Sequence, residues 1–139
     1  MVFLSSMGAL QGAGIFASYF AAKAWDWIFG EGLWAELQGT GVDVVSYVIG
    51  ATQGDNFHLE EVRSRPAVTG EDPSLQGALD RVRNPVTADF VARQLFEILP
   101  KEPTVYPNEA EAKTAQRVLA SSRRDAVLAM NKLTTANWG

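Results

Sequence analysis

The segment that decides the fold begins with Val2-Phe3-Leu4-Ser5-Ser6. This short apolar run ending in two serines predicts a buried strand, and glycines at positions 8, 12 and 14 indicate a glycine-rich loop after it. Apolar residues then recur at helical spacing over 16–38 on nearly every face, so we expect a helix that is buried on several sides. Gly39-Thr40-Gly41 ends this helix, and the β-branched run 42–48 predicts a strand covered on both faces. Strand, helix and strand form a βαβ unit, which is right-handed by default.

Two further helices are expected directly after this unit. The region 54–86 carries many charges and three prolines, which favours a long mobile loop with a short helix near Pro73–Arg83. Thr87 is expected to cap an amphipathic helix that Pro100 ends. Its apolar stripe consists of Val91, Leu95, Ile98 and Leu99.

The C-terminal segment predicts one more strand and one last helix. Thr104-Val105-Tyr106 is a short β-branched and aromatic run, typical of a strand. The last helix is expected to begin with a capping box from Asn108 to Glu111. Together these elements predict an α/β fold with about three parallel strands and flanking helices, in one domain that spans residues 1–139.

Composition excludes several classes of function. Twelve Lys and Arg against 16 Asp and Glu give a formal charge of −4 and a pI near 4.9, which argues against nucleic acid as a partner. Without cysteine there is no disulfide, no cysteine-based zinc site and no thiol nucleophile. The single histidine, His58, rules out a multi-histidine metal site, and with its acidic neighbours we interpret it as solvated surface. The charged pair Arg63 and Arg65 is interpreted in the same way, and no metal is expected.

The apolar N-terminal stretch 1–24 does not resemble a targeting segment. Its first basic residue is Lys23, so it lacks the positive start of a signal peptide, and serines and glycines interrupt the apolar run. We therefore expect a cytoplasmic protein without a membrane span. A secreted helical protein cleaved after Ala24 is an alternative, which the mass of an exported product would reveal.

Tyr19 and Lys23 form the strongest candidate for chemistry. They lie four residues apart, so a helix places them on one face. A free phenol has a pKa near 10, and a nearby ammonium lowers that value and prepares the phenol to exchange a proton near neutral pH. Ser6, at the end of the first strand, offers a hydroxyl to hydrogen-bond and polarise a substrate carbonyl. Alone the pair is weak evidence, because any helix can place an exposed lysine one turn after a packed tyrosine.

The context of the pair resembles a known family. Ser6 closes an apolar strand, a glycine-rich loop follows, and Tyr19-Phe20-Ala21-Ala22-Lys23-Ala24 begins 13 residues later. With Gly41-Val42-Asp43-Val44 and Ile49-Gly50 further on, this order is similar to the second half of a short-chain dehydrogenase/reductase, which has a Rossmann-type, doubly wound parallel sheet. The resemblance implies an NAD(P)-dependent oxidoreductase that passes hydride between nicotinamide and a small carbonyl or alcohol substrate. It implies Ser6 as the substrate-positioning serine, Tyr19 as the general acid/base, and Lys23 as the residue that lowers the tyrosine pKa and binds the nicotinamide ribose.

The resemblance also implies contacts to the cofactor after the second predicted strand. The family has Pro-Gly and a nearby Thr there; Gly50 and Thr52 match, whereas Ile49 replaces the proline. The loop after Gly54 corresponds to the variable substrate lid of the family. In the family, the pyrophosphate-binding turn and the residue that selects NAD or NADP precede the part that this sequence resembles, so we expect nothing in the sequence to choose between the two cofactors.

The resemblance covers only the C-terminal half of the family's domain, so we expect the 139-residue chain to be inactive by itself. A three-stranded remnant would expose an unpaired strand edge and apolar helix faces, so we expect the chain to be poorly soluble or to associate. In a complete protein the resemblance implies a homo-oligomer that pairs through the 16–38 helix. The alternative is a truncated, noncatalytic interaction domain that pairs with another subunit.

Overall fold

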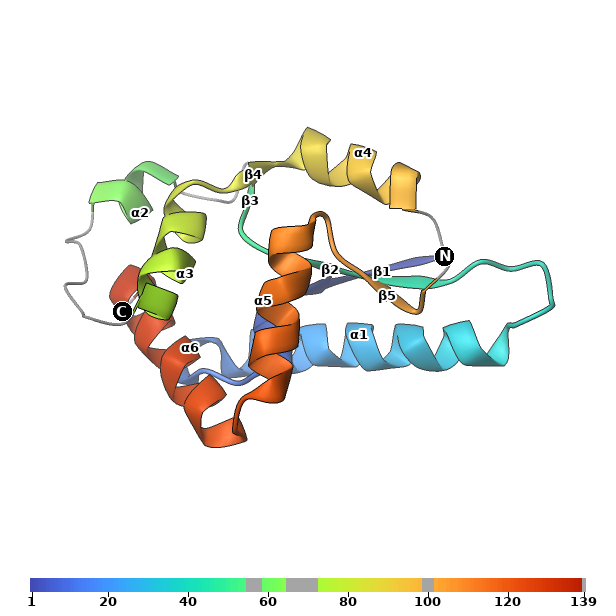
Figure 1. The fold of residues 1–139 in the computed structure, drawn as a ribbon, viewed down its shortest axis with the longest axis horizontal. Helices are drawn as coiled ribbons and strands as arrows, with labels where there is room; N and C mark the ends of the chain where they lie inside the picture. Colours follow the sequence, from blue (N-terminus) through green and yellow to red (C-terminus); the bar gives the residue numbers. More distant parts are fainter. Residues whose placement is uncertain (55–58, 65–72, 99–101, 139) are drawn as a thin grey trace.

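The computed structural model describes residues 1–54, 59–64, 73–98 and 102–138. Within these residues the main sheet has three parallel strands in the order β1-β2-β5, flanked by helices (Figure 1). The strands are β1 (Val2–Ser6), β2 (Val45–Ile49) and β5 (Thr104–Val105). β1 runs in register with β2 along its whole length, whereas β5 pairs with β2 only at Ser46 and Tyr47. The predicted α/β class and all three predicted strands are confirmed.

The first βαβ unit follows the predicted order. After β1 come two short 3₁₀ turns, η1 (Met7–Leu10) and η2 (Gly14–Phe16), and then the helix α1 (Ala17–Glu36). Gly39 and Gly41 take positive φ values of 77° and 82° in the turn that leads to β2. The first four residues of β2 are buried, which confirms a strand covered on both faces.

Two buried serines and one glycine hold α1 close to the sheet. The Ser5 hydroxyl donates to the Lys23 carbonyl at 2.7 Å, and the Ser46 hydroxyl donates to the Trp27 carbonyl at 2.8 Å. A Cβ at Gly30 would overlap the Ser46 hydroxyl and lie 3.1 Å from the Phe3 side chain. The missing side chain at Gly30 therefore lets the helix approach both strands.

The opposite face of the sheet packs against α4 (Ala88–Ile98). Side chains alternate along a strand, so Val45 and Tyr47 of β2 face away from Ser46 and α1. They form a core cluster with Val91 of α4 and Val105 of β5. The Thr87 hydroxyl accepts from the Phe90 N–H at 3.2 Å, which confirms the predicted cap of this helix.

Burial around β1 and α1 differs from part of the prediction. Val2 and Leu4 are 44% and 48% exposed, and among the α1 residues only Phe20 and Gly30 are buried. The expectation of a buried first strand and of a helix covered on several sides is therefore wrong for this chain. The physical reason is that β1 lies at an edge of the three-stranded sheet, so little covers the outer side of β1 and α1. The expected exposure of a strand edge and of apolar helix faces is confirmed.

The region between β2 and α4 holds more structure than predicted. β3 (Thr52–Gln53) pairs in parallel with β4 (Val86–Thr87), and the helices α2 (Leu59–Ser64) and α3 (Pro73–Arg83) lie between them in sequence. The predicted helix α3 is confirmed. The pair β3–β4 and α2 were not predicted, because such short elements contain too few residues to set a periodic pattern. The expected loop mobility falls partly on residues 55–58 and 65–72, outside the described residues.

The predicted single last helix is wrong: the structure has two helices. They are α5 (Glu109–Ala120) and α6 (Arg123–Trp138). Ser121 is extended, with φ −78° and ψ 162°, and Ser122 accepts from the Asp125 N–H at 3.1 Å, which begins α6 in a new direction. Within the described ranges, no helix is long and apolar enough to span a membrane.

The helix α6 returns to the glycine-rich loop that follows β1 (Figure 1). The Asn131 side-chain oxygen accepts from the Gly14 N–H at 3.0 Å, and Arg123 donates to the Leu10 carbonyl at 2.6 Å. Hydrogen bonds from α6 therefore hold the segment between β1 and α1 in place.

Candidate active site

The candidate site lies where β1 and β2 end side by side. Ser6 is paired with Ile49 in the parallel register, so Ser6 and Gly50 leave the sheet at the same edge. In open α/β sheets, ligands bind in the crevice beyond the carboxyl ends of the strands. Two of the segments singled out from the sequence therefore meet at the edge where such folds bind ligands.

Ser6 is oriented by the loop that follows it. Its hydroxyl oxygen accepts from the Gly8 N–H at 3.2 Å and caps η1. A Cβ at Gly8 would overlap the Phe20 ring, so the loop packs directly on α1. With its oxygen held by Gly8, the Ser6 hydroxyl keeps its proton for donation to a bound molecule.

Lys23 is bound to β1 and to its own helix. Its ammonium donates to the Leu4 carbonyl at 2.8 Å and forms an ion pair with Asp26 at 2.9 Å. An ammonium has three N–H donors, so one donor is left after these two contacts. Together with the Ser5 bond to the Lys23 carbonyl, these contacts place this turn of α1 against the second half of β1.

Tyr19 lies one helical turn before Lys23 and is 47% exposed. Its ring contacts Phe16 and Phe20, with centroid distances of 6.3 Å and 5.6 Å. Its hydroxyl makes no hydrogen bond to any described residue, Lys23 included. The phenol is thus accessible to a ligand, and its expected coupling to the ammonium stays a prediction.

Gly50 follows β2 and Thr52 begins β3; this short segment is called here the 50–52 loop. The Thr52 hydroxyl donates to the Gly50 carbonyl at 3.2 Å, and the Gly50 N–H donates to a carboxylate oxygen of Glu111 at 3.0 Å. The sequence interpretation placed Glu111 only in a helix cap. Its own N–H does donate to the Asn108 side chain at 2.9 Å, which confirms Asn108 as the cap. The carboxylate, however, points to Gly50, a contact that no local pattern indicates.

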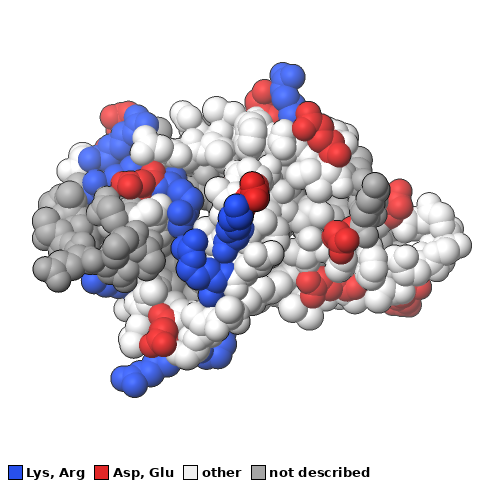
Figure 2. Space-filling view, in the orientation of Figure 1, with Lys and Arg blue, Asp and Glu red and all other residues white. Residues whose placement is uncertain are grey.

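Glu111 is a buried carboxylate with a perturbed pKa. Glu111 is only 6% exposed, and this burial raises the pKa of its carboxyl group above the usual value. The Gly50 N–H, Arg81 and Asn108 act in the opposite direction. Burial, with a smaller contribution from the Glu111 charge, also raises the pKa of Tyr47 to about 12. Basic side chains gather over α3 and α5, from which Arg81 and Glu111 come (Figure 2).

Of the other charged candidates, Arg63 does not join this site. Arg63 donates to the Arg83 carbonyl at 3.1 Å, and its guanidinium lies 3.7 Å from the Glu60 carboxylate. Both are contacts of the exposed surface. His58 and Arg65 lie outside the described residues. In the part of the chain that the structure describes, no group of three or more His, Asp or Glu side chains could hold a metal ion.

The fold defines the class of protein as a Rossmann-like α/β domain with a parallel sheet. Comparison with known protein families and with curated proteins finds no match. Among solved structures, a chain from a study of 7beta-hydroxysteroid dehydrogenase stereoselectivity matches with a TM-score of 0.70 and 21% sequence identity. The match covers 93% of this chain and 46% of that chain, so this chain spans less than half the length of its structural neighbour. At this identity the similarity establishes the fold.

Proposed function

We propose that this chain is the catalytic and substrate-binding half of an NAD(P)-dependent oxidoreductase of the short-chain dehydrogenase/reductase type. The observation that carries the proposal is that two predicted segments end at one sheet edge and that the helix with the Tyr19–Lys23 pair is bound to one of the two strands. Ser6 ends β1, Gly50 follows the neighbouring end of β2, and Lys23 binds its turn of α1 to β1. Similarity of fold to a hydroxysteroid dehydrogenase supports the same class.

In this proposal Tyr19 carries the proton. Its exposed hydroxyl, free of partners among the described residues, would hydrogen-bond the oxygen of a carbonyl or alcohol substrate and give or take its proton. Ser6 would donate to the same substrate oxygen, since Gly8 already holds the Ser6 oxygen. Lys23, one turn away on the same helix face, would favour the phenolate form of Tyr19.

The residues present fit the nicotinamide end of the cofactor. The one N–H donor of Lys23 without a partner suits a ribose hydroxyl, and the 50–52 loop lies at the adjacent strand end. The nicotinamide would supply or accept the hydride. NAD and NADP differ at the adenosine ribose, away from the nicotinamide end, so these residues do not choose between the two cofactors.

The test is a reductase and dehydrogenase assay on the longest product of the reading frame that contains this chain. NADH and NADPH, with their oxidised forms, are offered with keto- and hydroxysteroids and with small ketones and alcohols. Tyr19→Phe should lower kcat by roughly 10²- to 10⁴-fold, because general acid/base catalysis contributes about that much. Tyr106→Phe removes a hydroxyl that the proposal does not use and is the matched control. Activity that survives Tyr19→Phe sinks the assignment.

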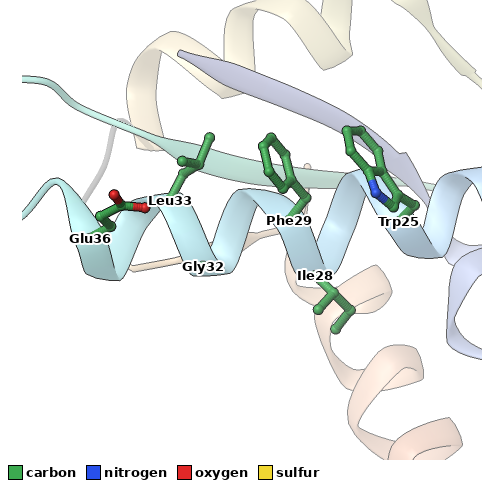
Figure 3. Close-up of a pocket in the computed structure, with 6 residues that line it drawn as sticks. All are labelled: Trp25, Ile28, Phe29, Gly32, Leu33 and Glu36. Carbon is green, nitrogen blue, oxygen red and sulfur yellow. The ribbon is translucent and has the colours of Figure 1, made fainter.

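We also propose that the protein pairs with a copy of itself through α1. Trp25 and Ile28 are 60% and 58% exposed, and Trp25 stacks on Phe29 at a centroid distance of 4.6 Å. Trp25, Phe29 and Leu33 project from one side of α1, and Ile28 from the other (Figure 3). These side chains line an open groove of about 470 Å³ together with Gly32 and Glu36. An exposed apolar surface of this kind favours burial against a partner.

A further inference from the structure

We infer that Glu111 is a positioning residue whose carboxylate, carried by the first turn of α5, holds the backbone of the 50–52 loop in place. The inference rests on the proposed function only in taking this loop as the part of the chain that meets nicotinamide. Glu111 itself would touch neither substrate nor cofactor and would act through Gly50.

Both backbone polar groups of Gly50 are hydrogen-bonded to a side chain. The Gly50 N–H donates to Glu111 at 3.0 Å, and the Gly50 carbonyl accepts from the Thr52 hydroxyl at 3.2 Å. A Cβ at Gly50 would lie 2.9 Å from one carboxylate oxygen of Glu111, so the carboxylate lies directly against the Gly50 backbone. The two residues are 61 positions apart in sequence, and the contact therefore joins α5 to the end of β2.

The choice of a carboxylate at this position needs an explanation beyond packing. Four neighbouring residues interact with its charge. Arg81 of α3 attracts the Glu111 carboxylate, and Asn108 before α5 and the Gly50 N–H after β2 form hydrogen bonds with it. Besides burial, the charge of Glu111 in turn raises the pKa of Tyr47 in β2. Burial outweighs this support and disfavours the ionised form. A glutamine would accept from Gly50 without that penalty, and charged groups kept in unfavourable surroundings are typical of functional sites.

The experiment measures hydrogen exchange of the Gly50 amide in the full 139-residue chain, near neutral pH. Glu111→Ala removes the acceptor and should speed exchange at Gly50 by about tenfold or more, as expected for loss of a hydrogen bond to a charged group. Glu111→Gln keeps an acceptor oxygen at the same reach and should restore most of the protection. Glu109→Gln is the matched control. It removes the same charge from the same helical turn, but Glu109 is exposed and paired with Lys113.

A second measurement does not need Glu111→Ala, in case that variant does not fold. The Gly50 amide resonance is followed during an acid titration. It should shift as Glu111 takes up a proton, at a pH above the usual range for a glutamate, and the shift should vanish in Glu111→Gln. Unchanged Gly50 exchange in a folded Glu111→Ala variant, or a Gly50 resonance that ignores the titration, overturns the inference.

Addition of NADH or NADPH to the same samples tests the proposed function separately. Movement of the Gly50 and Thr52 resonances in the wild type, reduced in Glu111→Ala, supports both the loop assignment and its positioning by Glu111. If Gly50 protection depends on Glu111 but neither nucleotide moves these resonances in the longest product of the reading frame, the positioning stands and the proposed cofactor contact fails.

Discussion

Ser5 and Lys23 are joined by a hydrogen bond of 2.7 Å from the Ser5 hydroxyl to the Lys23 backbone carbonyl. Ser5 is 1% exposed, and the Lys23 ammonium returns to β1 by donating to the Leu4 carbonyl at 2.8 Å. The two consecutive serines thus have different tasks. Ser5 fixes α1 to the strand, and Ser6 faces the loop at the sheet edge, where its hydroxyl caps η1.

Replacement of Ser5 should destabilise the fold. Ser5→Ala removes the hydroxyl that donates to the Lys23 carbonyl, and loss of this hydrogen bond should lower the free energy of unfolding by about 0.5–1.5 kcal/mol. Urea denaturation followed by tryptophan fluorescence measures the change. Ser18→Ala, on the exposed side of the same helix, is the control and should stay within about 0.5 kcal/mol of wild type. A Ser5→Ala variant as stable as this control would contradict the role given to Ser5.

Two glycines of α1 should respond to alanine with opposite signs. Gly30→Ala places a methyl group against Ser46 and Phe3 and should destabilise the protein by about 1–3 kcal/mol through overpacking. Gly32→Ala meets nothing within 4 Å and should stabilise the helix by about 0.5–1 kcal/mol, because alanine is the better helix former. Thermal unfolding of both variants checks the pair, and equal shifts would show that α1 does not approach the sheet as described.

Glu111 should make stability depend on pH with a definite sign. Its folded-state pKa lies above its usual value of 4.5, so the fold favours the protonated form. The stability that this preference contributes is fully present below the unfolded pKa and is lost as the pH rises through the folded pKa. The unfolding free energy of wild type minus that of Glu111→Gln should therefore fall with rising pH. A difference that is flat or rises across this range would contradict the environment described for Glu111.

The apolar face of α1 should drive association. Trp25→Ala removes the most exposed large side chain of the groove and should shift the protein toward monomer in sedimentation velocity runs over a range of concentrations. Phe96→Ala is the control, because Phe96 is a 74% exposed aromatic residue on α4, outside the groove. A wild-type chain that stays monomeric at every concentration would rule out pairing through this face.

The sequence by itself determined the first βαβ unit, the third strand and the helix that Thr87 caps. These elements follow from local signals, such as β-branched runs, helical periodicity, glycine stops and a hydroxyl at a cap, each of which acts over one or two turns of chain. The positions of Ser6 and Gly50 at one sheet edge follow as well, because parallel strands in one sheet end on the same side.

Only the tertiary structure decided what each element meets. The contact of Glu111 with Gly50, the break between α5 and α6, and the exposure of β1 and of the outer side of α1 depend on which segments the folded chain brings together. Local periodicity marks a side chain as apolar or polar, but it does not say whether another element covers it. A buried carboxylate bound to a loop 61 residues away arises only when the chain between them has closed and water has left the contact.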